Sequence, residues 1–229
     1  MQSEANTPSK GDKTRVRQSA IRAVYDKEVL YQILDAALIG HVAFMSEGWP
    51  QSIPTAIARL DDRLYLHGSR KSRLYQTLAK GDPVCVSVCM VDALVKARSA
   101  FHCSMNYRSA VIFSRGEVVS GDEKALLLDR YTERLIPGTE GNYREPLAKE
   151  LKATELIGLS LDDYSAKVRI GDPVDDEQDT ELPYWAGVIP LHTVPGVPVA
   201  AADLPNGVEL SDSNLHAIQQ LQAIYAGRG

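Results

Sequence analysis

The feature that most constrains the fold is a series of at least six short apolar runs, each bounded by turn residues. Between His41 and His67, turn residues at 46–48 and 60–62 separate three such runs. Helical patterns occur among the runs but do not alternate regularly with them. The sequence therefore favours a mainly β, antiparallel barrel with peripheral helices over a doubly wound parallel sheet. We expect residues 41–67 to form an antiparallel meander.

Periodicity and capping residues give approximate bounds for the elements. Asp26 is a suitable N-cap for the first helix, which Gly40 should end. The alternation of side chains between the two faces changes beyond Ser109, which predicts a bulge or loop in an otherwise extended region. The expected strands are 41–45, 52–59, 63–67, 84–91, an extended region to 119, 155–161, 166–170 and 184–191, and the expected helices are 27–37, one starting at 69, 121–138, 146–153 and 212–225.

Polarity divides the chain into three parts. Residues 1–19 are polar and poor in large apolar side chains, which predicts a flexible leader. Residues 20–200 contain the strand pattern and form the predicted barrel domain, and residues 201–229 form a C-terminal extension with a helix. Residues 171–183 carry six carboxylates and two prolines, a composition typical of an exposed loop.

Composition excludes several classes of protein. The net charge of −5 argues against general nucleic-acid binding. No apolar run is long enough to span a bilayer, and no secretory signal is recognisable, so a cytoplasmic protein without a membrane partner is expected. Cys85, Cys89 and Cys103 lack the spacing of a zinc site, and the five histidines are scattered, so no protein-made metal site is expected.

The segment Ser69-Arg70-Lys71-Ser72-Arg73 concentrates cations where a strand pattern gives way to a helix pattern. The start of a helix already carries a partial positive charge, so three cations there are unfavourable unless an anion lies among them. Hydroxyls, guanidiniums and an ammonium are suitable donors for a phosphate group. The alternative is a basic helix face in contact with solvent.

A second polar set lies in the extended region. If that region is a strand, Arg98, His102, Ser104, Asn106 and Arg108 share one face. Arg108 is the preferred functional residue, and a plain solvent-facing strand is the alternative.

Two further side chains are candidates for a ligand site. His67 ends a strand directly before the basic segment, which would set its ring beside a ligand there, although a hydrogen-bonded structural histidine is the alternative. Trp185 belongs to the core by default, but it could also form a flat wall for an aromatic ligand.

Four segments in this order resemble the pyridoxamine 5′-phosphate oxidase-like superfamily, and most closely its nitroimidazole-resistance (Nim-like) flavin-nucleotide-binding branch. They are 52–59 (SIPTAIAR), 64–74 (LYLHGSRKSRL), 91–109 and 184–191 (YWAGVIPL). The resemblance covers residues 15–200. It implies an FMN-binding split barrel, usually a homodimer with the flavin between the subunits.

The same resemblance implies roles for individual residues. The strand carrying Ile53, Pro54 and Thr55 would line the flavin ring, residues 69–73 would hold the phosphate, and His67 would lie near the ring. The strand of residues 106–109, with Asn106 and Arg108, would lie near the site. Trp185 would close the pocket from the partner subunit.

The resemblance also implies a function, although the sequence departs from the family pattern at one point. The stretch after Trp185 lacks the Arg and His motif with which pyridoxamine phosphate oxidases grip their substrate, so vitamin B6 is not the expected substrate. The first hypothesis is an FMN-dependent oxidoreductase that carries electrons from a reduced nicotinamide, deazaflavin or protein donor to a small aromatic or nitro-type substrate. His67 and Arg108 are its catalytic candidates.

Two alternatives stay open. One is a non-catalytic protein that binds flavin, as FMN or FAD, or binds haem through His67 or His102. The other is a purely structural β-barrel module. The spectrum of the purified protein shows whether flavin, haem or neither is bound, and anaerobic reduction by NADH or NADPH separates an oxidoreductase from a storage protein.

Overall fold

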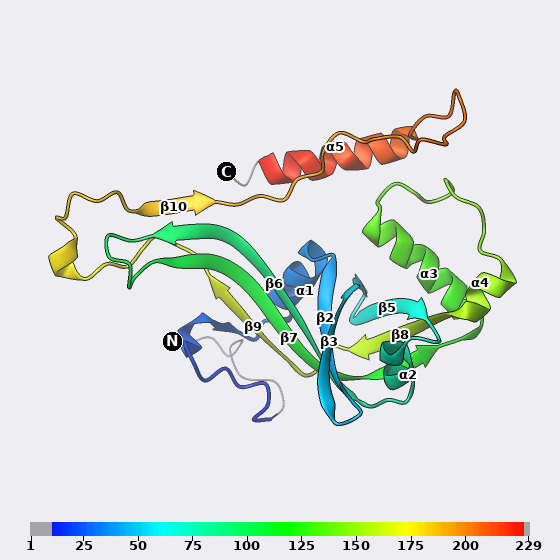
Figure 1. Ribbon diagram of the computed structural model, residues 1–229, viewed down its shortest axis with the longest axis horizontal. Helices are drawn as coiled ribbons and strands as arrows, with labels where there is room; N and C mark the ends of the chain where they lie inside the picture. The colour runs from blue at the N-terminus through cyan, green and yellow to red at the C-terminus, as the bar shows by residue number, and fades with distance from the viewer. Residues whose placement is uncertain (1–10, 227–229) are drawn as a thin grey trace.

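Figure 1 shows the computed structural model of the chain, which describes residues 11–226. The strands are β1 (Ala23–Val24), β2 (Ile39–Ser46), β3 (Trp49–Ala56), β4 (Ala58–Leu60), β5 (Arg63–Ser69), β6 (Pro83–Lys96), β7 (Ser104–Val119), β8 (Thr154–Ser160), β9 (Tyr164–Arg169) and β10 (Gly187–Pro190). The helices are α1 (Lys27–Ala36), α2 (Arg73–Ala79), α3 (Gly121–Leu135), α4 (Ala148–Ala153) and α5 (Asp212–Ala226), with short 3₁₀ turns η2 (Ala20–Arg22) and η3 (Glu177–Asp179).

The strands form one antiparallel sheet system with the path β3-β2-β6-β7-β8-β5-β4. Off this path, β10 pairs with β6, β9 pairs with β7, and β1 pairs with β9. The sheet curves around one side of the molecule, with α1 and α3 beside it (Figure 1). The predicted class, an antiparallel split barrel with peripheral helices, is confirmed.

The meander predicted over residues 41–67 is confirmed at its two hairpins, but the strand predicted over 52–59 is divided between β3 and β4. β2 and β3 pair along their whole length, from Ile39↔Ala56 to Ser46↔Trp49. The chain then passes the buried Ile57 into the β4–β5 hairpin, and β5 pairs with β8 instead of returning to β3. Local alternation predicts that a run is a strand but does not choose among distant partners of similar pattern.

The long β6–β7 hairpin also differs from the prediction. β7 runs without a break past Ser109, and the register shift lies in β6, between Val91 and Ala93. The extra residue there is Asp92, whose carboxylate accepts hydrogen bonds from Arg108. The bulge predicted near Ser109 is therefore wrong, because Ser109 pairs on both sides, with Cys89 of β6 and with Lys167 of β9.

Helix α1 begins as expected, because the Asp26 side chain accepts a hydrogen bond from the Glu28 backbone N–H. It ends at Ala36, so Gly40 does not end it but lies in β2. A Cβ on Gly40 would come within 3.0 Å of Ile57 and Val86, so this glycine serves close packing.

The buried apolar residues form two clusters. The larger one fills the barrel beneath α1 and α2, and the smaller one lies under α3 and includes Tyr65, Leu127 and Tyr131. Strand alternation explains the division, since Leu64 and Leu66 of β5 enter the larger cluster while Tyr65 enters the smaller. Residues 64–66 of β5 are therefore covered on both faces.

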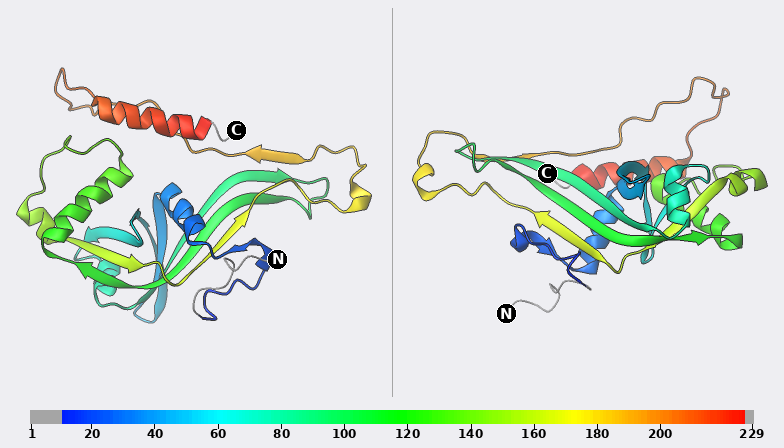
Figure 2. Two further views of the ribbon diagram at one scale, coloured as in Figure 1. Left: turned by 180° about the vertical axis from the view of Figure 1, so that it is seen from behind. Right: turned by 60° about the horizontal axis from the view of Figure 1, so that its bottom comes forward.

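The two ends of the described chain lie on different parts of the surface (Figure 2). Of the leader predicted over residues 1–19, only residues from 11 onward are described. They contact the body through a Lys13–Asp163 ion pair and a hydrogen bond from the Val16 N–H to Tyr25. No helix of the described residues combines the length and apolar character needed to cross a membrane.

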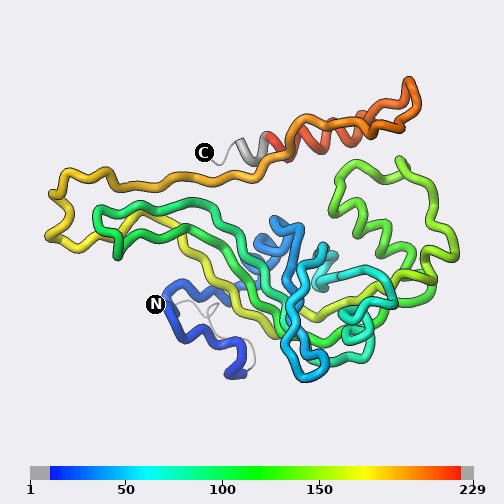
Figure 3. Tube along the Cα trace, in the orientation of Figure 1, coloured from blue at the N-terminus to red at the C-terminus, as the bar shows by residue number. Residues whose placement is uncertain are grey.

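After β10 the chain runs outward along the molecule and then doubles back as α5 (Figure 3). The Gln222 side chain donates to the Pro195 carbonyl, so α5 packs along the segment that precedes it. The start of α5 is attached to the loop after α3, because Ser213 donates to the Gly138 carbonyl and Asn214 to that of Pro137.

Candidate functional site

The basic segment forms a turn and not the first turn of a helix. β5 extends to Ser69, which pairs with Thr154 of β8, and α2 begins only at Arg73. The N–H groups of Arg70, Lys71 and Ser72 bond to Ala153 O, Ser69 Oγ and Ser69 O at 3.2, 3.3 and 2.9 Å. The predicted helix start at residue 69 is thus wrong, and side chains rather than these backbone N–H groups are available to a ligand.

The three cations of this turn have different surroundings. Arg70 Nε lies 2.9 Å from Glu155 Oε2, and the Glu155 side chain is only 9% exposed. Lys71 and Arg73 are exposed, and within residues 11–226 neither has a carboxylate at ion-pair distance. Arg70 therefore compensates a buried charge, whereas the charges of Lys71 and Arg73 are not compensated by any carboxylate of the described residues.

Tyr75 of α2 connects two of the predicted ligand strands. Its hydroxyl donates to the His67 carbonyl and lies 3.4 Å from the Thr55 hydroxyl. A Cβ on Gly68 would lie 2.2 Å from the Tyr75 ring, so only glycine fits between His67 and Ser69. β3, β5 and α2 consequently meet beside the basic turn. Sequence reasoning missed Tyr75, although Gly68 inside a strand is a signal of close approach.

His67 is the histidine of this corner. Its side chain is exposed, yet its ring lies 4.6 Å from the Tyr131 ring, edge to face at 84°. Desolvation by the surrounding protein lowers the pKa of His67, which keeps the imidazole neutral at pH 7. Neutral imidazole is the form that binds metals.

Tyr131 supports this ring from α3. It is 1% exposed, and its hydroxyl is buried without a hydrogen-bond partner in the described part of the chain. Burial raises the pKa of Tyr131, so it stays a phenol. Sequence analysis predicted a helix over residues 121–138, which contains Tyr131, but gave this residue no role at the site.

Ile53, Pro54 and Thr55 lie on β3, at one end of the strand path. β3 pairs with β2 along one side, for example Pro54 with His41. Its other side is an edge, where a proline is tolerated because no ladder partner needs its N–H. Exposed edge groups of this kind are suited to contact a flat ligand.

The other predicted site residues lie elsewhere. Asn106 accepts a hydrogen bond from Arg169 and donates to the Gly171 carbonyl at 3.1 Å. Arg108 Nη2 lies 2.6 Å from Asp92 Oδ1. Trp185 is 59% exposed, and its carbonyl accepts a bond from Lys96. All three belong to the long hairpin or to the segment beside it.

One chain does not bring these residues to the basic turn. Val119 of β7 pairs with Leu156, which pairs with His67, so Val119 marks the position of the turn on β7. Arg108 lies eleven residues earlier on the same strand, on the order of 30 Å along it. Asn106 lies further still.

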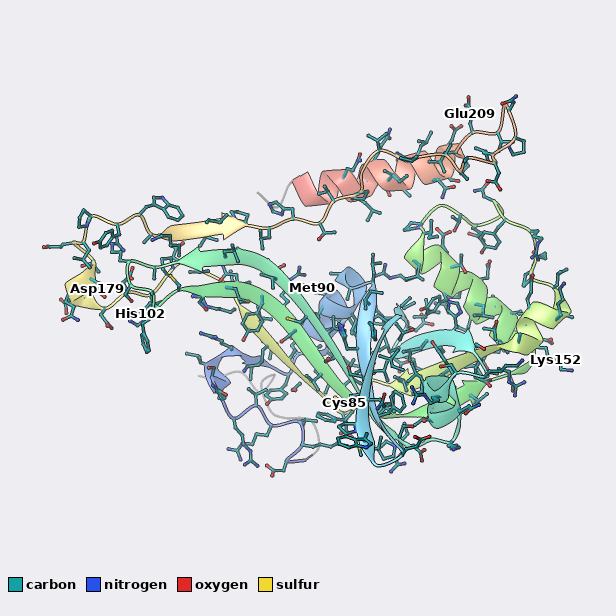
Figure 4. All side chains as sticks on the ribbon, viewed as in Figure 1. Cys85, Met90, His102, Lys152, Asp179 and Glu209 are labelled. Carbon is teal, nitrogen blue, oxygen red and sulfur yellow. The ribbon has the colours of Figure 1, made fainter. Side chains whose placement is uncertain are left out.

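His102 is also remote from His67. It lies in the loop between β6 and β7, where its Nε2 is 3.2 Å from Asp176 Oδ2. Figure 4 shows His102 and Asp179 at one end of the molecule and Lys152 at the other. Lys152 precedes β8 by two residues, so it marks the end where the basic turn lies.

The chain was compared with curated proteins and with solved structures, and relatives were found among the structures. No curated protein matches the sequence. Among solved structures, the flavocytochrome Anf3 from Azotobacter vinelandii is 37% identical, with a TM-score of 0.86, over 92% of this chain and 98% of its own. The FAD and haem binding protein from Mycobacterium smegmatis is 36% identical, with a TM-score of 0.82, over 88% and 97%.

A third structure shows the fold alone. A putative 5-nitroimidazole antibiotic resistance protein from Bacteroides thetaiotaomicron is 20% identical, with a TM-score of 0.55, over 64% of this chain and 86% of its own. The sequence model described as pyridoxamine 5′-phosphate oxidase matches residues 26–168, more than half of the chain. The protein therefore belongs to the pyridoxamine 5′-phosphate oxidase family.

Proposed function

We propose that this protein binds a flavin, as FAD, together with a haem, and that it transfers electrons between a reduced donor and an acceptor. The observation that carries the proposal is the corner at His67, where an exposed, neutral imidazole precedes two exposed cations that have no carboxylate at ion-pair distance among residues 11–226. Two relatives above 30% identity, which match over nearly their whole length, are described as an FAD and haem binding protein and as a flavocytochrome.

The residues of the corner fit these groups chemically. His67 offers a nitrogen ligand for haem iron, a role that neutral histidine commonly fills. Lys71 and Arg73 offer positive charge to the phosphates of a flavin nucleotide or to haem propionates. The free side of β3 offers backbone groups to a flat ring. When bound, the flavin supplies two-electron chemistry and the haem one-electron transfer.

FAD replaces FMN in this proposal because the Mycobacterium smegmatis relative is described as binding FAD. The acceptor, a small aromatic or nitro-type molecule, remains a hypothesis, since the nitroimidazole-resistance structure is too distant to carry function. Reduction by NADH or NADPH under anaerobic conditions, followed by addition of a nitroaromatic compound, tests both electron transfer steps.

The absorption spectrum of the freshly purified protein and the mass of its released cofactors test the binding. We expect flavin bands, a haem Soret band and the mass of FAD. His67→Ala should lose the Soret band and keep the flavin, while the matched control His102→Ala should keep both. A wild-type protein that is colourless and takes up neither group on reconstitution contradicts the proposal.

We also propose that two copies of the chain form the site. Asn106, Arg108 and Trp185 lie too far along the hairpin to share a ligand with residues 69–73 of the same chain. A row of half-exposed apolar side chains crosses three paired strands near them, and its members are Ile189, Leu94 and Met105. A second copy that covered this row would bring the hairpin of one subunit to the basic turn of the other.

Mixed dimers test the shared site. One parent carries Lys71→Ala with Arg73→Ala, and the other carries Trp185→Ala. If each site takes residues from both subunits, a mixed dimer has one undamaged site and recovers up to half of the flavin lost by its parents. If each site lies within one chain, mixing restores nothing. Light scattering gives the oligomeric state.

A further inference from the structure

We propose that Tyr75 and Tyr131 are positioning residues that hold His67 in the orientation needed to bind haem iron; this rests on the function proposed above. We call this pair the tyrosine mount. Neither tyrosine was a site candidate in the sequence. Both lie in helices, Tyr75 in α2 and Tyr131 in α3, and they contact His67 from different directions.

Tyr75 holds the backbone of His67. Its hydroxyl donates to the His67 carbonyl, and its ring occupies the space that a side chain at position 68 would need. On the other side of the strand, His67 pairs with Leu156 and Gly68 with Glu155 of β8. The peptide between His67 and Gly68 is therefore held between a buried ring and a paired strand.

Tyr131 holds the imidazole. Leu66 faces the larger core and is fully buried, so strand alternation directs His67 to the face covered by α3. There the Tyr131 ring lies 4.6 Å from the imidazole at 84°. Tyr131 packs with Leu127 and Leu156 in the smaller cluster, so its ring is not free to move away.

The mount matters because an exposed histidine on a strand otherwise samples several rotamers. A metal ligand must hold its nitrogen along one direction, and the contacts of a ligating histidine commonly fix its ring orientation. The edge-to-face contact supplies that restraint here through an aromatic ring. The Tyr131 hydroxyl lacks a partner among the described residues, so the ring and not the hydroxyl carries the role.

Because the ring of Tyr131 carries the role and its hydroxyl does not, two substitutions at this position form a matched pair. Tyr131→Phe keeps the ring and removes an unpaired buried hydroxyl, so the haem spectrum should be unchanged and the haem-free melting temperature equal or higher. Tyr131→Leu removes the ring, so haem transfer to apomyoglobin should be at least tenfold faster and the Soret band should shift. Tyr75→Phe keeps the ring against Gly68 but frees the His67 carbonyl, and a smaller acceleration is expected.

A measurement without haem keeps the proposal testable if Tyr131→Leu does not fold, in which case Tyr131→Met replaces it. Histidine side-chain NMR of the haem-free protein should show a ring-current-shifted His67 resonance in the wild type and in Tyr131→Phe, and its loss in the variant without a ring. The proposal is overturned if variants without the ring release haem at the wild-type rate. A wild-type protein that takes up no haem instead refutes the proposed function.

Discussion

The two ends of the β6–β7 hairpin differ in what surrounds their polar side chains. Near α2, Arg70 compensates a buried carboxylate and His67 packs against a buried ring. At the other end, Arg98 and His102 pair with aspartates of the acidic loop, and Phe101 is 89% exposed. The first end is built around a core, and the second extends beyond it. The comparison teaches that side chains at the first end are held in place by the core, whereas those at the second end are held by ion pairs to a loop.

The largest expected effect comes from a glycine at the compact end. A Cβ on Gly116 would lie 2.2 Å from the Leu78 carbonyl oxygen, which is backbone and cannot turn away. Gly116→Ala should lower the free energy of unfolding by about 3 kcal/mol, measured by urea denaturation. Gly196→Ala, in the extended segment after β10, has no atom within 4 Å of the new carbon and should cost almost nothing. Equal effects of the two substitutions would show that the close approach of residue 116 to the Leu78 carbonyl does not limit the side chain there.

Arg70 is expected to have the next largest effect. Arg70→Ala leaves the Glu155 carboxylate buried without its partner, which should cost about 1–3 kcal/mol. Lys71→Ala, its exposed neighbour, should cost less than about 0.5 kcal/mol and act on flavin retention alone. Thermal melting and flavin titration of both variants separate stability from binding. A destabilised Lys71→Ala variant would show that the basic turn is structural throughout.

Glu133 should have a smaller effect that depends on pH. Its carboxylate accepts N–H bonds from Gly138, Thr139 and Glu140, and these bonds lower the pKa of Glu133 below its usual 4.5. The stabilisation is therefore complete above pH 4.5 and is lost as the pH falls through the lowered value. Glu133→Gln should cost about 1 kcal/mol at pH 7.

Urea denaturation at pH 7 and at pH 3 tests the direction of this pH dependence. The stability difference between the wild type and Glu133→Gln should shrink at pH 3, whereas Glu209→Gln, in the segment before α5, should show no difference at either pH. A difference that grew on acidification would contradict the assignment.

The smallest effect is expected at the extended end. Phe101→Ser removes a side chain that is 89% exposed in the single chain, so chain stability should change by less than about 0.5 kcal/mol. Denaturation monitored by circular dichroism provides the measurement. A loss above that value would show that the loop between β6 and β7 packs against something that the single chain does not contain.

Much of the fold could be predicted from the sequence because its signals are local. Asp26 caps α1, and the spacing of Leu127 and Tyr131 identifies α3. The partner of β5 could not be predicted, because several apolar strands have similar patterns. The start of α2 was misplaced for the same reason, since pairing with β8 extends β5 through Ser69.

The candidate site was predictable in its charges but not in their partners. Lys71 and Arg73 are exposed, as a ligand site requires. Arg70 forms an ion pair with Glu155, which is 85 residues away in sequence. Tyr75 and Tyr131 could not be assigned for the same reason. Their contacts with His67 exist only once α2 and α3 have docked on β5.

The attachment of α5 has a consequence for protease sensitivity. Residues 197–210 are exposed, and the start of α5 contacts the body through Ser213 and Asn214. A nick in this stretch would leave the last helix joined to the rest of the chain by polar contacts with the loop after α3 and with Pro195. Limited digestion should therefore release a C-terminal peptide readily from the isolated chain, and slower release at higher protein concentration would report a second copy covering the tail.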